Sequence, residues 1–138
     1  MRKWLAVCAV SALAQLSFAA WDGTAKLPKV VSGAYEITSP EELIGFLESV
    51  TTSNRADETL RAYLKNDIVF GADTSTLATK RWTTTKRNEY FVGDFDGRGH
   101  TVYGLNAEQA LFDVVGTSAG SIHDLNVANS SFGMQPRS

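Results

Sequence analysis

The sequence predicts an α+β fold in which an N-terminal helical cap precedes the first coils of a parallel β-helix, a β-solenoid. Two helix-type patterns between residues 39 and 64 indicate the cap. From Glu89 onward, short alternating apolar runs separated by Gly, Asp and Asn indicate strands. A six-residue pattern that occurs twice, 20 positions apart, indicates that successive turns of chain stack on one another.

Composition is that of one small folded domain. The chain has 138 residues, of which 43% are hydrophobic and 20% charged. These values exclude collagen-like, coiled-coil and strongly disordered proteins. The net charge is −2, so no basic excess predicts a nucleic-acid partner and no acidic block predicts a solvating tail.

Residues 1–19 have the three-part layout of a secretory signal peptide. Arg2 and Lys3 begin it, an uncharged apolar run from Trp4 to Leu16 follows, and Ser17 and Ala19 supply the small residues of a cleavage site. We expect cleavage after Ala19 or Ala20. A retained membrane anchor is the alternative, but the apolar run of about 13 residues is shorter than the roughly 20 that a spanning helix needs.

Cleavage would leave a secreted or cell-surface product with no stable membrane span. The single cysteine, Cys8, lies in the signal, so the mature chain would have no disulfide and no thiol nucleophile. Loss of Arg2 and Lys3 from the 13 basic residues would leave 11 against 15 acidic ones, a net charge of −4.

The predicted cap occupies residues 35–88, after an extended leader over 20–34. It begins with a short strand at Tyr35–Ile37. Ser39 is the expected N-cap of a first helix, with Pro40 at the first helical position and Glu42 completing a capping box. A second helix is predicted from about Ala56 to Leu64. Beyond it the sequence predicts a buried strand, 67–70, and a Thr-rich loop around Trp82.

The predicted coils occupy residues 89–130, followed by a polar tail over 131–138. Their candidate strands are Tyr90–Phe95, Thr101–Leu105, Leu111–Val115 and Ser121–Val127. The repeated pattern is TVYGLN at 101–106 and SIHDLN at 121–126. We therefore expect Val102 to stack on Ile122 and Leu105 on Leu125, unless the two segments are similar by chance.

The segment 91–105, FVGDFDGRGHTVYGL, resembles the F-x-G-x-F-D-G-x-G-H-x-I-x-x-L pattern of secreted bacterial GLUG-motif proteins, relatives of the pectin-lyase-like right-handed parallel β-helix proteins. Ala110–Asp113 stands where such proteins have G-L-F-G, although both glycines are replaced. Ile122–Leu125 matches the next coil. The resemblance covers about residues 35–130, and its most specific part is the Asp96–His100 run.

The resemblance implies a solenoid fold and an exported location, and it brings no catalytic residues. Such proteins are usually much longer, so it also implies a truncated product, or a chain that completes its core with a partner.

Two residues are candidates for binding a sugar face or an anionic polymer. Trp82 and Tyr90 flank the cations Lys86 and Arg87, an arrangement that suits carbohydrate contact when the rings are exposed. The alternative is that Trp82 packs onto the first coil, since tryptophan is highly buried on average.

Two aspartates are candidates for metal binding. Asp94 and Asp96 share one face of a predicted strand and offer oxygen ligands to Ca²⁺. The alternative is a polar strand end that enters the Gly97–Gly99 turn. No other cofactor is expected. His100 and His123 are the only histidines. Paired with Asp94, Asp96 or Asp124 they could be acid–base groups or metal ligands, but both are expected at solvent-facing positions.

These observations predict an exported, non-enzymatic module for adhesion, carbohydrate contact or scaffolding. Its partner would be a polysaccharide or a cell-surface protein. The alternative function is that of a truncated fragment of a polysaccharide-degrading, pectin-lyase-type enzyme; a non-functional remnant of a longer gene is a third possibility. No serine has a nucleophile-elbow context, and no phosphate-binding loop is present in the sequence.

Overall fold

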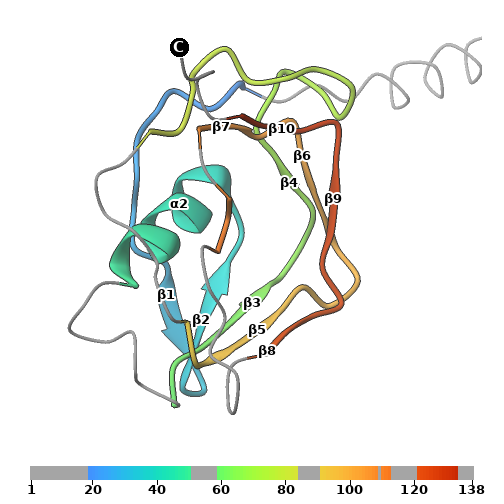
Figure 1. Cartoon of the computed structure of the whole chain (residues 1–138). Coiled ribbons are helices and arrows are strands. Elements are labelled where there is room, and N and C mark those ends of the chain that lie inside the picture. The colour runs from blue at the N-terminus through green and yellow to red at the C-terminus, as the bar shows by residue number, and fades with distance from the viewer. Residues whose placement is uncertain (1–18, 51–58, 84–90, 109, 113–120, 134–138) are drawn as a thin grey trace, which may run out of the picture.

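The computed structural model describes residues 19–50, 59–83, 91–108, 110–112 and 121–133. These residues form one helix and ten short strands (Figure 1). The elements are β1 (Lys29–Val31), β2 (Ala34–Ile37), α2 (Pro40–Ser49), β3 (Arg61–Leu64), β4 (Ile68–Val69), β5 (Asp94–Asp96), β6 (Thr101–Tyr103), β7 (Asn106–Ala107), β8 (Ser121–His123), β9 (Asn126–Ala128) and β10 (Ser131–Phe132).

The strands form three small sheets. One has the order β1-β2-β3-β5-β8, the second β4-β6-β9, and the third β10-β7. Every pair is parallel except β1 with β2, which is an antiparallel hairpin. The chain passes through the three sheets as β5, β6 and β7, and then again in the same order as β8, β9 and β10.

The predicted first helix is confirmed, and its start follows the expected chemistry. Ser39 is extended and its Oγ accepts a hydrogen bond from the Glu42 amide at 3.3 Å. Glu42 Oε1 in turn accepts from the Thr38 amide at 2.8 Å. Both bonds satisfy amides that a helix start leaves without partners. The apolar spacing then buries Leu43, Ile44, Phe46 and Leu47.

The Phe46 ring joins the helix to the five-stranded sheet. Its centroid lies 5.8 Å from that of Phe95 in β5 and 5.6 Å from that of Tyr35 in β2. Phe46 is fully buried. Figure 1 shows α2 lying inside the outline that the sheets trace, so its apolar residues face strands on several sides.

The predicted parallel β-helix is wrong. The described residues form three separate sheets, one of them mixed, and no closed solenoid. The expected stacking also fails, because Val102 pairs with Val127 and Ile122 pairs with Phe95. Equivalent positions are thus 25 or 27 residues apart, and not the 20 residues that the repeated pattern suggested. The fold class is α+β with mostly parallel strands.

The repeated pattern occurs where the chain turns from one strand into the next. It therefore does not mark the positions that stack on each other. Gly104 and Asp124 occupy the same place in TVYGLN and SIHDLN, and both have positive φ, +72° and +54°. Each follows a strand, β6 or β8, and precedes another, β7 or β9. The two copies therefore share a strand–turn–strand geometry but belong to different sheets.

Three further expectations change. The predicted second helix is wrong over 61–64, where β3 pairs in parallel with both β2 and β5. Residues 56–58 of that predicted helix lie outside the described part. The leader is more structured than expected, because Trp21 is buried and β1 joins the sheet. In the predicted polar tail, residues 131–132 form β10.

The strand pattern after residue 89 is confirmed in part. β6 and β8 lie within the predicted segments, whereas β5 and β9 overlap them and end one residue beyond. Leu111 and Phe112 are not strand, and 113–115 lie outside the described residues. Residues 1–18 of the predicted signal peptide also lie outside the described residues. Within the part of the chain that the structure describes, no helix has the length and apolarity to cross a membrane.

We predict that Phe46→Ala destabilises the fold by about 3–5 kcal/mol, because a buried ring is lost where helix and sheet meet. Urea unfolding followed by circular dichroism measures this. Leu27→Ala is the control, since Leu27 is 53% exposed and its loss should change stability by less than about 0.5 kcal/mol. Equal effects of the two substitutions would contradict the assigned core.

Candidate functional site

A row of polar side chains crosses the outer face of the five-stranded sheet. Lys29, Glu36, Tyr63, Asp96 and His123 occupy matching positions on β1, β2, β3, β5 and β8. Side chains alternate between the two faces of a strand, and Ala62 and Phe95, which precede Tyr63 and Asp96, are buried on the inner face. We call these five residues the polar row.

A buried carboxylate anchors one end of the polar row. The Glu36 side chain is 8% exposed, and its Oε2 accepts a hydrogen bond from the Tyr63 hydroxyl at 2.6 Å. The ammonium groups of Lys29 and Lys65 lie 3.4 and 3.9 Å from its Oε1. The Tyr63 hydrogen bond, helped by the two lysines, holds the pKa of Glu36 below its usual value against the opposing effect of burial.

The same hydrogen bond raises the pKa of Tyr63, because a phenolate would face the Glu36 carboxylate. The phenol is therefore a poor general base, since a base must lose its proton near the working pH.

Arg98 links Tyr63 to Asp96 within the polar row. Its guanidinium carbon lies 3.7 Å from the centroid of the Tyr63 ring, a cation–π contact. Its Nε is 4.0 Å from Asp96 Oδ2, and its backbone amide donates to Asp96 Oδ1 at 2.8 Å. Arg98 thus covers the tyrosine and fixes the orientation of the Asp96 carboxylate.

Three carboxylates surround one imidazole at the other end. His123 Nε2 lies 3.0 Å from Asp94 Oδ1, and Nδ1 lies 3.0 Å from Asp124 Oδ2 and 3.7 Å from Asp96 Oδ1. We call these four residues the His123 cluster. The hydrogen bond to Asp124, followed by the charges of Asp94 and Asp96, raises the pKa of His123, which favours the imidazolium.

The His123 cluster includes the residues predicted to bind metal. Asp94 and Asp96 do share the outer face of β5, and both reach His123. Ligand atoms of Asp96, His123 and Asp124 all lie within 4.8 Å of one another, so these three could hold an ion. The 20-residue offset aligns His123 with Tyr103 and not with Asp96, so the sequence favours a solvent-facing histidine over a ligand beside the aspartates. The 27-residue offset between β5 and β8 is the spacing that places His123 beside Asp96.

His100 makes a separate pair. Its Nδ1 lies 3.3 Å from Asp67 Oδ1, which also accepts a hydrogen bond from the Thr101 amide at 2.9 Å. Neither residue of this pair belongs to the His123 cluster.

Of the two predicted sugar-binding residues, the structure describes Trp82 alone. Trp82 is 2% exposed, and its indole N–H donates to Glu48 Oε2 at 3.0 Å. Its ring is thus not open to a sugar face. Tyr90, Lys86 and Arg87 lie outside the described residues.

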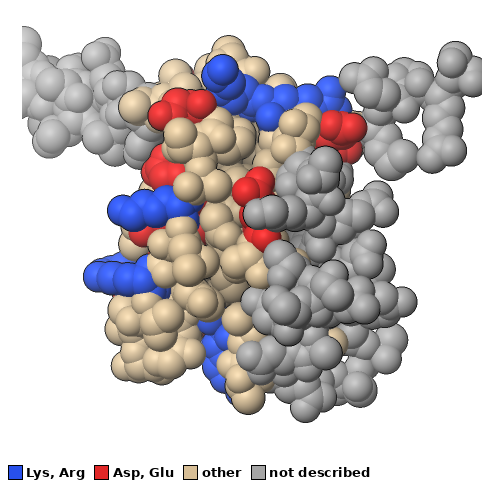
Figure 2. All heavy atoms as spheres, turned by 90° about the vertical axis from the view of Figure 1, so that its left-hand side faces the viewer, with Lys and Arg blue, Asp and Glu red and all other residues tan. Residues whose placement is uncertain are grey.

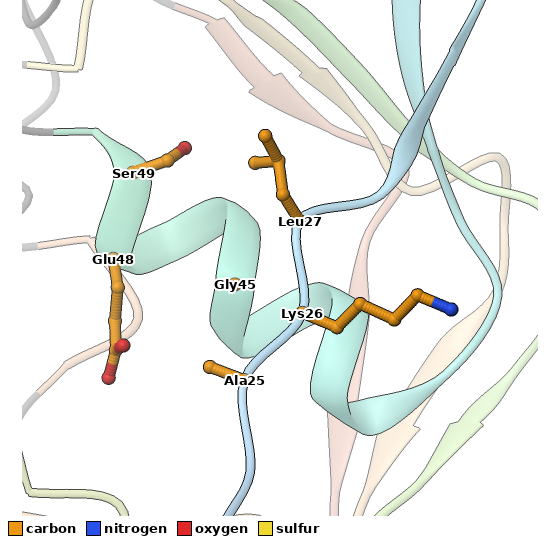
Figure 3. Close-up of a pocket in the computed structure, with 6 residues that line it drawn as sticks. All are labelled: Ala25, Lys26, Leu27, Gly45, Glu48 and Ser49. Atoms are coloured by element: carbon orange, nitrogen blue, oxygen red, sulfur yellow. The ribbon is translucent and has the colours of Figure 1, made fainter.

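A shallow hollow lies between α2 and the segment before β1 (Figure 3). Its volume is about 280 Å³, and it is lined by Ala25, Lys26, Leu27, Gly45, Glu48 and Ser49. A Cβ at Gly45 would stand 2.1 Å from the Lys26 carbonyl oxygen, so the glycine permits this close approach. In Figure 3 the Lys26 side chain points away from Glu48. The hollow therefore brings together no acid–base pair.

Charges on the side of the molecule that carries β1 are mixed. Figure 2 shows basic and acidic side chains interspersed over the described part of this face. Basic side chains gather along the upper edge of this face, with acidic ones to either side.

Comparison with known protein families, with curated proteins and with solved structures gives no match. The resemblance to GLUG-motif proteins stays a prediction from the motif residues.

We predict that Glu36→Gln flattens the acid limb of the stability curve. A carboxyl group with a lowered folded-state pKa stabilises the fold above its unfolded pKa, near 4.5, and this contribution disappears as the pH falls through the folded value. Unfolding free energies measured between about pH 7 and pH 2 test it. Glu108→Gln, which changes an exposed carboxylate outside the polar row, should keep the wild-type slope. A wild-type slope in Glu36→Gln would contradict the role of Glu36.

Proposed function

We propose that this chain is an exported, non-enzymatic surface module that serves adhesion or scaffolding. The charged start, apolar run and small residues of the first 19 positions support export. The function rests chiefly on the polar row, whose charged groups are paired with one another across five strands.

Groups paired in this way stabilise the folded surface and are not free to act in catalysis. A general base needs a free lone pair close to substrate and a pKa near the working pH. Glu36 is instead buried beneath two lysines and hydrogen-bonded to Tyr63, and the pKa of Tyr63 is raised. Arg98 covers the tyrosine ring. The row therefore acts as a set of cross-strand contacts that stabilise the sheet.

A protein surface suits this face better than a sugar does. Sugar binding by stacking needs an exposed aromatic ring, whereas the aromatic ring of the polar row, Tyr63, is 9% exposed and lies under the Arg98 guanidinium. The acidic and basic side chains that alternate along the polar row instead favour complementary ion pairs and hydrogen bonds with another protein. A cell-surface protein is therefore the partner class that we propose.

A polysaccharide-degrading activity is the second candidate. It is favoured by one observation, namely that two carboxylates of β5 and an imidazole of β8 lie together on an open face. Acid–base cleavage of a polymer uses groups of these types.

Export is tested by producing the full chain in a secreting bacterial host. We expect the product outside the cytoplasm, beginning at Ala20 or Trp21, because the signal peptidase recognises the small residues before these positions. Intact mass spectrometry measures the start. A full-length product retained in the cytoplasm would contradict export.

The non-enzymatic assignment is tested on uronic acid polymers, with and without Ca²⁺. We expect no release of unsaturated or reducing ends above the rate in buffer. His123→Gln serves as the matched variant. Cleavage by the wild type that disappears in His123→Gln would establish the second candidate and overturn the first.

A further inference from the structure

We propose that Asp96, His123 and Asp124 bind a divalent first-row transition metal ion, with Zn²⁺ as the best match, and that Asp94 orients the imidazole. This inference does not depend on the proposed function. It rests on the mixed nitrogen and oxygen donors of the His123 cluster and on the distances between them.

The donor separations are close to those of a tetrahedral site. Zn–N and Zn–O bonds of about 2.0–2.2 Å place neighbouring ligand atoms roughly 3.3–3.6 Å apart. His123 Nδ1 lies 3.0 Å from Asp124 Oδ2 and 3.7 Å from Asp96 Oδ1. The Asp96 and Asp124 ligand atoms lie within 4.8 Å of each other, so a shift of these exposed carboxylates completes three ligands, and water can occupy a fourth position.

The second ring nitrogen has the partner that metal-binding histidines usually have. His123 Nε2 lies 3.0 Å from Asp94 Oδ1. A carboxylate at this position fixes the tautomer with hydrogen on Nε2, turns the ring, and leaves the Nδ1 lone pair for the metal. Asp94 thus acts as a positioning residue.

The backbone holds the two carboxylate ligands in place. Asp96 Oδ1 accepts the Arg98 amide, which limits its rotation. The Asp124 corner is tied to the turn after β5, because its carbonyl oxygen accepts the Gly99 amide at 2.8 Å. A Cβ at Gly97 would stand 2.4 Å from that same oxygen, so only glycine allows the corner to approach this closely.

The donor set selects against Ca²⁺, which the aspartates alone had suggested. Calcium prefers six to eight oxygen ligands at longer distances, whereas an imidazole nitrogen suits zinc and its neighbours. The site is open to solvent, with exposed side-chain fractions of 40% for His123 and 69% for Asp124. Where the imidazole carries a proton on both nitrogens, the metal ion replaces the one on Nδ1.

The chain contains only two histidines, so one spectrum separates the sites. We would titrate ¹⁵N-labelled, tag-free protein with Zn²⁺ and follow the ring nitrogens by NMR. We expect saturation at one equivalent, with the His123 Nδ1 resonance shifted and His100 unchanged. No saturation below about 1 mM Zn²⁺, or an equal response of both histidines, would overturn the proposal.

Variants locate the ligands by calorimetry. His123→Gln should weaken Zn²⁺ binding at least tenfold, and Asp94→Asn should weaken it roughly 10–100-fold through loss of ring orientation. His100→Gln is the matched control and should bind as the wild type does, because its partner Asp67 is not in the cluster. Circular dichroism confirms that each variant is folded. Wild-type affinity in His123→Gln, or competition by equimolar Ca²⁺, would contradict the assignment.

Discussion

The parallel pairing of β5 with β8 decides both the interior and the outer face of this protein. In the observed register Phe95 stands beside Ile122 on the inner face, and Asp96 stands beside His123 on the outer one. A slip of one residue would reverse every side chain, because side chains alternate along a strand. The apolar pair therefore specifies the register, and the polar cluster follows from it.

Packing of helix α2 also constrains the position of β5. Phe46 lies against Phe95, and Phe112 contacts Phe95 from another direction, with ring centroids 5.3 Å apart. The aromatic packing fixes β5 from inside the molecule. Outside, each carboxylate of the polar row has a cation or a hydroxyl for a partner, which offsets the repulsion among Asp94, Asp96 and Asp124. Packing and electrostatics thus favour the same arrangement.

Local features were predictable from sequence, whereas long-range pairing was not. The Ser39 cap and Pro40 predict α2 because helix-start chemistry is contained within four residues. Segment 61–64 has a helical spacing of apolar residues, yet β2 and β5 hold it as a strand, and neither neighbour is adjacent in the chain. Tertiary pairing overrides the local pattern there.

The same difference between local features and long-range pairing decides which residues of the candidate site could be predicted. Asp94 and Asp96 could be placed on one face from their spacing alone. Placing His123 beside them requires the distance along the chain between stacked strands, which the corner motif misrepresents. Glu36 and Tyr63 were missed because their pairing joins residues 27 positions apart on separate strands.

Engineered cysteine pairs test the β5–β8 register most directly, since Cys8 in the predicted signal is the only cysteine of the chain. The account predicts that Asp96→Cys combined with His123→Cys forms an intramolecular disulfide on mild oxidation, because in-register neighbours of a sheet lie within disulfide range. Tyr103→Cys combined with His123→Cys, the pair of the 20-residue repeat, should stay reduced. A disulfide in the second pair and none in the first would contradict the register and the cluster built on it.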